Sequence, residues 1–202
     1  MDALELFLRE HAIAHSAQVA AGEQRSSEDF ILRHLDEAQM RARPHGLNSL
    51  AWLVWHMARS EDVGINVVIA GQRQVFDEGD WAARLNVTRR DVGTGMSADE
   101  VAELSEQIRI PELRLYRAAV GRRTREVVAA LPPAAWGEIV EAAETARARS
   151  QGAYGPGAEW LERFCTGKSK AWYFYWIAVG HNHLHLGQAR WVRKLLLGKG
   201  QV

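Results

Sequence analysis

Residues 180–188, GHNHLHLGQ, set the interpretation of the whole chain, because they carry three histidines directly after an apolar run. This run, residues 171–179, reads AWYFYWIAV, and a histidine is costly to bury in such surroundings unless it has a partner. On a helix, His181 and His185 are four positions apart and share one face. His183 points about 200° away from both. The spacing therefore predicts an imidazole pair on the inward face of a helix.

Two imidazoles in this arrangement can converge on one metal ion, as they do in a helical H-E-x-x-H site. The third ligand must come from elsewhere, and residues 48–62, NSLAWLVWHMARSED, offer His56 on the side of Leu53. Three neutral imidazoles suit zinc, nickel, iron and copper alike, and they leave a coordination position open for water or substrate. The alternative is a set of core histidines bonded to backbone or to an acid. The spacing favours a divalent metal held by His56, His181 and His185.

Other residues near these histidines allow more than one interpretation. Gln188 lies one turn beyond His185 and either orients that ligand through a hydrogen bond to its imidazole or faces solvent. His183 is expected at a groove, a subunit contact or the solvent surface. His11 and His15 form a second pair four residues apart, and we expect both to be partly exposed. The alternative is that one of the two enters the metal site.

Two acids and the single cysteine are further candidates. Glu61 and Asp62 lie one to two turns past His56 and could act as a general base, but capping or salt bridging is the favoured use. Cys165 has no paired base nearby in sequence, which argues against a nucleophile.

The tryptophans are concentrated beside the histidine regions, with Trp52 and Trp55 on one predicted helix and Trp172 and Trp176 on the other. They either fill the core and a subunit interface or form the walls of an apolar pocket above the metal.

Length and composition indicate an ordinary soluble protein. The 202 residues are enough for a single helical domain over 1–202, with 47% hydrophobic and 25% charged residues. Lys+Arg and Asp+Glu balance at 25 each, which argues against broad binding to nucleic acid or to an anionic membrane. The acidic N-terminus lacks the basic region of a signal peptide, and no apolar run reaches the roughly 20 residues of a membrane span. A cytoplasmic location is expected.

Helical periodicity predominates and no segment alternates like a strand, so we expect an all-α four-helix bundle. The first expected helix is capped by Asp2, runs to about residue 18 and weakens near Gly22, and the second runs from Ser26 or Ser27 through Leu35. A third runs from an Asn48 cap to about Ala70 with Gly71 as its stop, and a fourth runs from a Ser97 capping box to about Leu131 with a kink at Pro111. The others are a helix over 134–149, a short one over 159–164, and one from a Ser169 cap to about Leu197. A linker over 72–95 contains Trp81 and at most one helical turn.

Residues 48–62 and 181–188 together resemble the DinB/YfiT-like superfamily. The resemblance covers nearly the whole chain in layout: an early helix, a helix that begins N-S-L-x-W-L and carries one histidine, a long third helix, and a last helix with H-x-x-x-H-x-x-Q. The combination in this order is more specific than any of its short motifs. His183, between the two expected ligands, departs from the pattern.

The resemblance implies a DinB-like four-helix bundle with up-down-down-up connectivity. It also implies a divalent metal, zinc or nickel, held by three histidines that correspond here to His56, His181 and His185. Characterised members of the superfamily include bacillithiol S-transferases and mycothiol-dependent maleylpyruvate isomerases, and many others are described as metal-dependent hydrolases.

Three functions follow as hypotheses. The first is an enzyme that activates water or a low-molecular-weight thiol at the metal and acts on a small-molecule substrate. The second is a non-catalytic stress-response binding module on the same bundle. The third is an interaction protein whose tryptophans form a homodimer interface, and a homodimer is also expected for the enzyme.

Overall fold

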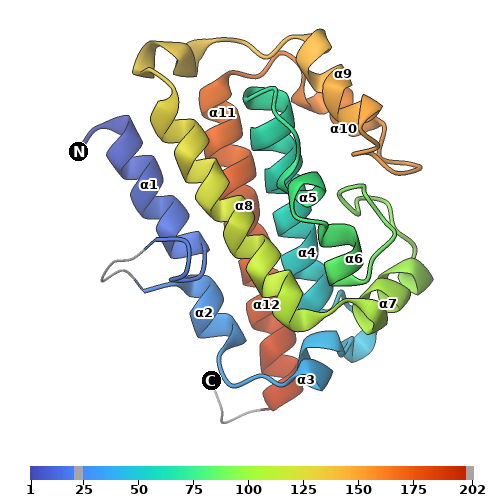
Figure 1. The fold of residues 1–202 in the computed structure, drawn as a ribbon. Helices are drawn as coiled ribbons and strands as arrows, with labels where there is room; N and C mark the ends of the chain where they lie inside the picture. The colour runs from blue at the N-terminus through green and yellow to red at the C-terminus, as the bar shows by residue number, and fades with distance from the viewer. Residues whose placement is uncertain (21–24, 199–202) are drawn as a thin grey trace.

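The computed structural model describes residues 1–20 and 25–198, and the regular elements in these ranges are helical (Figure 1). They are α1 (Ala3–Ala14), α2 (Ser27–Leu32), α3 (Glu37–Arg41), η1 (Pro44–Gly46), α4 (Leu50–Glu61), η2 (Asp62–Ile69), α5 (Val75–Glu78), α6 (Trp81–Leu85), α7 (Ala98–Gln107), α8 (Ile110–Ala130), η3 (Pro133–Gly137), α9 (Ala142–Ser150), α10 (Trp160–Cys165), α11 (Lys170–Tyr175), η4 (Trp176–Gly180) and α12 (His181–Leu197). The all-α prediction is confirmed. Within the described ranges, no helix combines the length and hydrophobicity that a membrane crossing requires.

Four long helical units lie alongside one another: α1, α4 with its continuation η2, α8, and the run α11–η4–α12 (Figure 1). The helices α9 and α10 lie at one end of this bundle, and α3 and α7 lie at the other. α4 is buried on nearly every face, from Leu50 through Arg59. A helix that is apolar all round belongs in the middle of a core, so the helix that carries His56 is the central one.

The start of α4 differs from the prediction by one residue. Ser49, and not Asn48, is the N-cap, because its hydroxyl accepts the Trp52 N–H at 2.9 Å. After Glu61 the helix continues as the π-helical segment η2, and Gly71 follows with a φ of 64°. The predicted stop at Gly71 is confirmed, since a left-handed residue ends a helix at little cost when it is glycine.

The region after residue 97 contains two helices where one kinked helix was predicted. The Ser97–Glu100 capping box is present, but α7 ends at Gln107. Pro111 lies in the first turn of α8. Proline lacks the N–H that a helix interior needs, but the first turn of a helix does not use its N–H groups in helical bonds. It therefore begins the second helix instead of bending a single one.

The predicted helix over 134–149 is interrupted. A 3-10 turn, η3, precedes an extended segment, and α9 begins only at Ala142. In the extended segment Val140 N–H donates to Lys168 O at 2.9 Å and Val140 O accepts from Gly167 N–H at 2.9 Å. These bonds to a distant part of the chain replace the helical ones.

Three smaller predictions also need correction. The second helix, capped by Ser26, ends at Leu32 and does not reach Leu35. The first helix ends at Ala14, with His15 extended at a φ of −109°, and does not reach residue 18. The segment 72–95 holds two short helices, α5 and α6, instead of at most one turn. The weakening predicted near Gly22 lies outside the described residues.

Candidate metal centre

The structure brings His56, His181 and His185 together. His56 comes from the middle of α4, and the other two come from the first two turns of α12. The Nε2 atom of His181 lies 3.1 Å from Nε2 of His56 and 3.0 Å from Nε2 of His185. Because α12 is regular from His181 onward, the predicted four-residue spacing does place both imidazoles on one face.

The outer nitrogens of two rings are held by partners that define the tautomer. His56 Nδ1–H donates to Val92 O at 2.5 Å, and His185 Nδ1–H donates to Gln188 Oε1 at 2.8 Å. A neutral imidazole with a proton on Nδ1 carries a lone pair on Nε2. Two lone pairs therefore point at His181 Nε2, and at most one proton lies among the three converging nitrogens.

This donor set fits a divalent metal ion. Nitrogen ligands at about 2.0–2.1 Å from a tetrahedral zinc lie about 3.3 Å apart, close to the distances between these Nε2 atoms. Burial and the neighbouring His185 lower the pKa of His56 to about 3. Burial also lowers the pKa of His181 well below its usual value, and that of His185 in the same direction. All three rings are thus kept neutral, which is the form that binds metal.

The tryptophan pairs divide into two roles. Trp52 stacks on His56 with ring centroids 4.8 Å apart and planes within 9°, and its Nε1–H points at the Met96 sulfur at 3.2 Å. Trp176 lines a cavity that reaches His56 and His181. Trp55 is fully buried in the hydrophobic core, and Trp172 packs against Trp176. The apolar pocket is present, with one tryptophan of the four in its wall.

The prediction for His11 and His15 is wrong. Both side chains are completely buried, and neither enters the group of His56, His181 and His185. They lie on either side of one buried carboxylate instead: His11 Nε2 is 2.9 Å from Glu61 Oε1, and His15 Nε2 is 2.9 Å from Glu61 Oε2.

Glu61 holds the four helical units together. Its Oε2 atom also accepts from Arg117 of α8 at 2.9 Å and from the Asn182 amide of α12 at 2.8 Å. Arg117 in turn pairs with the buried Glu28 at 3.1 Å. The favoured prediction for Glu61, an ion pair, is confirmed. With both oxygens engaged, this carboxylate is not positioned to act as a general base.

Although His11, His15 and Glu61 also lie within ligand distance of one another, two observations favour a hydrogen-bonded network over a second metal site. The Arg117 guanidinium already supplies a positive charge to Glu61. The outer Nδ1 atoms of His11 and His15 have no hydrogen-bond partner. Metal-ligating histidines almost always have such a partner. In the group of His56, His181 and His185, two of the three rings have one and His181 Nδ1 has none, whereas neither His11 nor His15 has one.

The buried histidines predict acid sensitivity of the metal-free protein. Burial is the main cause that lowers the pKa of five rings: His11, His15, His56, His181 and His185. Below pH 6.5 the unfolded chain protonates them while the folded chain does not, so the unfolded state binds more protons. Each such histidine lowers the unfolding free energy by up to about 1.4 kcal/mol per pH unit. Glu28, whose pKa is raised chiefly by burial, offsets part of this loss.

We therefore expect a lower urea midpoint at pH 5.5 than at pH 7.5 for protein stripped with chelator, at constant ionic strength. An unchanged or higher midpoint at pH 5.5 would contradict the buried neutral state of these rings.

The remaining candidates lie apart from the three converging nitrogens. His183 is half-buried on another face of α12 and is not in the group. Cys165 is buried at the end of α10, and burial raises the pKa of its thiol to about 11. A thiol with this pKa is a poor nucleophile near neutral pH, which agrees with the prediction.

Sequence reasoning missed three groups that support the site. Val92 acts through its backbone carbonyl, so its side chain gives no signal. Arg117 and Asn182 lie on helices far apart in the sequence, and only the fold brings them to Glu61. The available signal was the His11–His15 pair, whose spacing implied a shared partner.

The comparisons with known proteins agree with this architecture. The family model for the DinB superfamily matches residues 23–189. A solved structure described as a conserved protein of locus from Enterococcus faecalis has a similar fold, with a TM-score of 0.70 and 18% sequence identity, over 98% of this chain and 99% of that chain. No match was found among curated proteins.

Proposed function

Because the chain belongs to the DinB superfamily, we propose that it is a metal-dependent enzyme that acts on a small molecule at the site of His56, His181 and His185. The observation that carries the proposal is that His181 Nε2 lies 3.1 Å from His56 Nε2 and 3.0 Å from His185 Nε2, close to the separation of two ligand nitrogens on one zinc ion. A divalent ion bound there, zinc or nickel, would act as a Lewis acid and lower the pKa of a coordinated water or thiol.

The residues of the chain have separate tasks in this proposal. The three imidazoles bind the ion and leave a position open beside the cavity. Val92 O and Gln188 Oε1 orient His56 and His185 through the Nδ1–H groups. Trp52 covers one face of His56 and keeps water from that side of the ring.

Thiol transfer ranks before hydrolysis for a specific reason. The described residues that line the cavity beside His56 and His181 include no carboxylate and no lysine. Hydrolysis benefits from a general base that positions a water. A thiol needs only to ionise: it loses its proton to solvent, its sulfur bonds to the electrophilic carbon, and the leaving group departs with the electrons of the broken bond.

The test is consumption of a low-molecular-weight thiol by zinc- or nickel-loaded protein with an electrophile such as an alkyl halide. We expect a rate above the uncatalysed reaction that is lost in His56→Ala. Metal binding without thiol consumption or ester hydrolysis would instead support a non-catalytic binding module.

A homodimer is the second part of the proposal, and an exposed stripe on α12 supports it. Leu184, Trp191 and Leu195 share a face at helical spacing and are 51%, 64% and 44% exposed. Apolar side chains exposed together often mark an interface. We expect a dimer in sedimentation at micromolar concentration, and a monomer for Trp191→Lys. Leu115→Lys, on the outer face of α8, is the matched control, and a monomeric wild-type protein would refute the stripe as an interface.

A further inference from the structure

The cavity beside the histidines has a wall of unusual construction. The π-helical segments η2 and η4 face each other there, one directly after α4 and the other directly before His181. They approach so closely that a Cβ on Gly64 would lie 2.8 Å from Ile177 Cγ2. π-Helical turns are rare and recur at functional sites, and here they position the cavity wall next to two metal-binding imidazoles.

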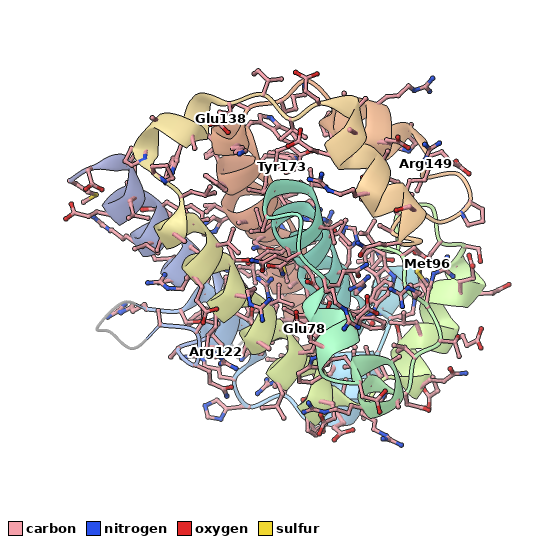
Figure 2. All side chains as sticks on the ribbon, turned by 45° about the horizontal axis from the view of Figure 1, so that its top comes forward. Glu78, Met96, Arg122, Glu138, Arg149 and Tyr173 are labelled. Atoms are coloured by element: carbon pink, nitrogen blue, oxygen red, sulfur yellow. The ribbon has the colours of Figure 1, made fainter. Side chains whose placement is uncertain are left out.

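The lining is apolar and aromatic. The residues that form it are His56, Ser60, Val63, Gly64, Val68, Val92, Thr94, Tyr154, Leu161, Phe164, Cys165, Tyr173, Trp176, Ile177 and His181. Figure 2 shows Tyr173 between α11 and the continuation of α4. The rim includes Phe164, which is 42% exposed, and the half-buried Leu161.

The charge of this lining restricts what can enter. Besides the two imidazoles, its polar groups are the hydroxyls of Ser60, Thr94, Tyr154 and Tyr173, the thiol of Cys165 and the indole N–H of Trp176, and among the described residues it contains no carboxylate, lysine or arginine. Tyr173 already donates to Cys165 O at 3.0 Å. A carboxylate or an ammonium group would lose its hydration here without gaining an oppositely charged partner. An apolar group loses nothing and is removed from water.

We propose that this cavity and its aromatic rim together bind a small, uncharged apolar group, such as one substituted aromatic ring, on the electrophilic co-substrate of the reaction. The cavity measures about 80 Å³, so it holds a few heavy atoms and leaves the remainder of the molecule at the aromatic rim. The assignment as co-substrate site rests on the proposed function, whereas the binding preference is a property of the cavity itself.

The test compares three probes that share one ring: 4-fluorotoluene, 4-fluorobenzoate and 4-fluorobenzylammonium. Binding is followed by fluorine NMR on full-length protein stripped with chelator, so that the carboxylate cannot bind a metal. We expect 4-fluorotoluene to bind at least about tenfold more tightly than either charged probe, a ratio equal to about 1.4 kcal/mol. Equal binding of the three probes would overturn the proposal.

Two variants place the binding in this cavity. Leu161→Lys puts a cation at the rim and should weaken 4-fluorotoluene binding and strengthen 4-fluorobenzoate binding. Thr94→Trp, in a loop outside the helices, should fill the cavity and abolish binding even if Leu161→Lys fails to fold. Leu115→Lys on α8 is the matched control and should change nothing. If 4-fluorotoluene still binds to the Thr94→Trp variant, its ring binds outside this cavity and the proposal is refuted.

Metal stoichiometry measured on the same preparations separates the two ideas. Uncharged-ring preference without metal binding would leave the cavity inference standing and remove the proposed function. Metal binding without a preference for the uncharged ring would leave the proposed function standing and remove the cavity inference.

Discussion

His185→Ala is expected to abolish metal binding, whereas His183→Ala should leave most of it. His185 Nε2 lies 3.0 Å from His181 Nε2, and its ring is 4.6 Å from that of His56. His183 lies on another face of the same helix and is not in the group. Removing one of three imidazoles takes away a bond and the geometry of the site. The loss should therefore exceed the roughly 10- to 100-fold that mutating a residue which only orients a metal ligand costs.

Competitive titration of zinc against a chromophoric chelator measures this difference. Gln188→Ala should fall between the two histidine variants, with an affinity loss of about 10- to 100-fold, because Gln188 only orients His185. Release of the metal by His183→Ala, together with retention by His185→Ala, would show that the face assigned to α12 is wrong.

Glu61→Gln is expected to be the most destabilising isosteric change in the protein. The substitution removes a buried negative charge that four groups contact: His11, His15, Arg117 and Asn182. Burial alone would raise the pKa of Glu61, but His15, Arg117 and His11 outweigh it and keep the pKa well below its usual value. Breaking a buried ion pair by removing one partner costs about 3–5 kcal/mol, since the other charge stays buried. Glu28 still pairs with Arg117, which places the expected loss near the lower figure.

Urea unfolding of metal-free protein at pH 7.5 gives the free energy change. Glu138→Gln is the matched control, because its carboxylate also pairs with a cation, Lys170 at 2.7 Å, but is 58% exposed. An exposed pair contributes about 0–1 kcal/mol. Equal losses for the two variants would mean that Glu61 does not hold the four helical units together.

The Glu61→Gln substitution should also weaken the metal site. Asn182 is the neighbour of His181, and its amide donates to both Glu61 Oε2 and Ala178 O. Loss of one of these bonds should loosen the first turn of α12. If the variant folds, we expect weaker zinc binding than in the wild-type protein, in the same titration.

Local patterns predicted much of this protein because they depend on nearby residues alone. The four-residue spacing of His181 and His185 determines that they share a helix face wherever that helix packs. The Ser97 capping box and the Gly71 stop depend on hydroxyl and backbone geometry within one turn. The resemblance of 48–62 and 181–188 to a known superfamily extended these local patterns to the bundle.

Tertiary structure decided which histidine pair faces which partner. His11 and His15 have the same spacing as His181 and His185, so periodicity does not distinguish the pairs. The first pair meets a carboxylate that Arg117 and Asn182 also contact, and the second meets the lone pair of His56. Burial and partners depend on residues from other helices, and backbone bonds such as Val140 to Lys168 interrupt a helix that composition favours. Because those partners lie far away in the sequence, only packing of the four helical units brings them into contact.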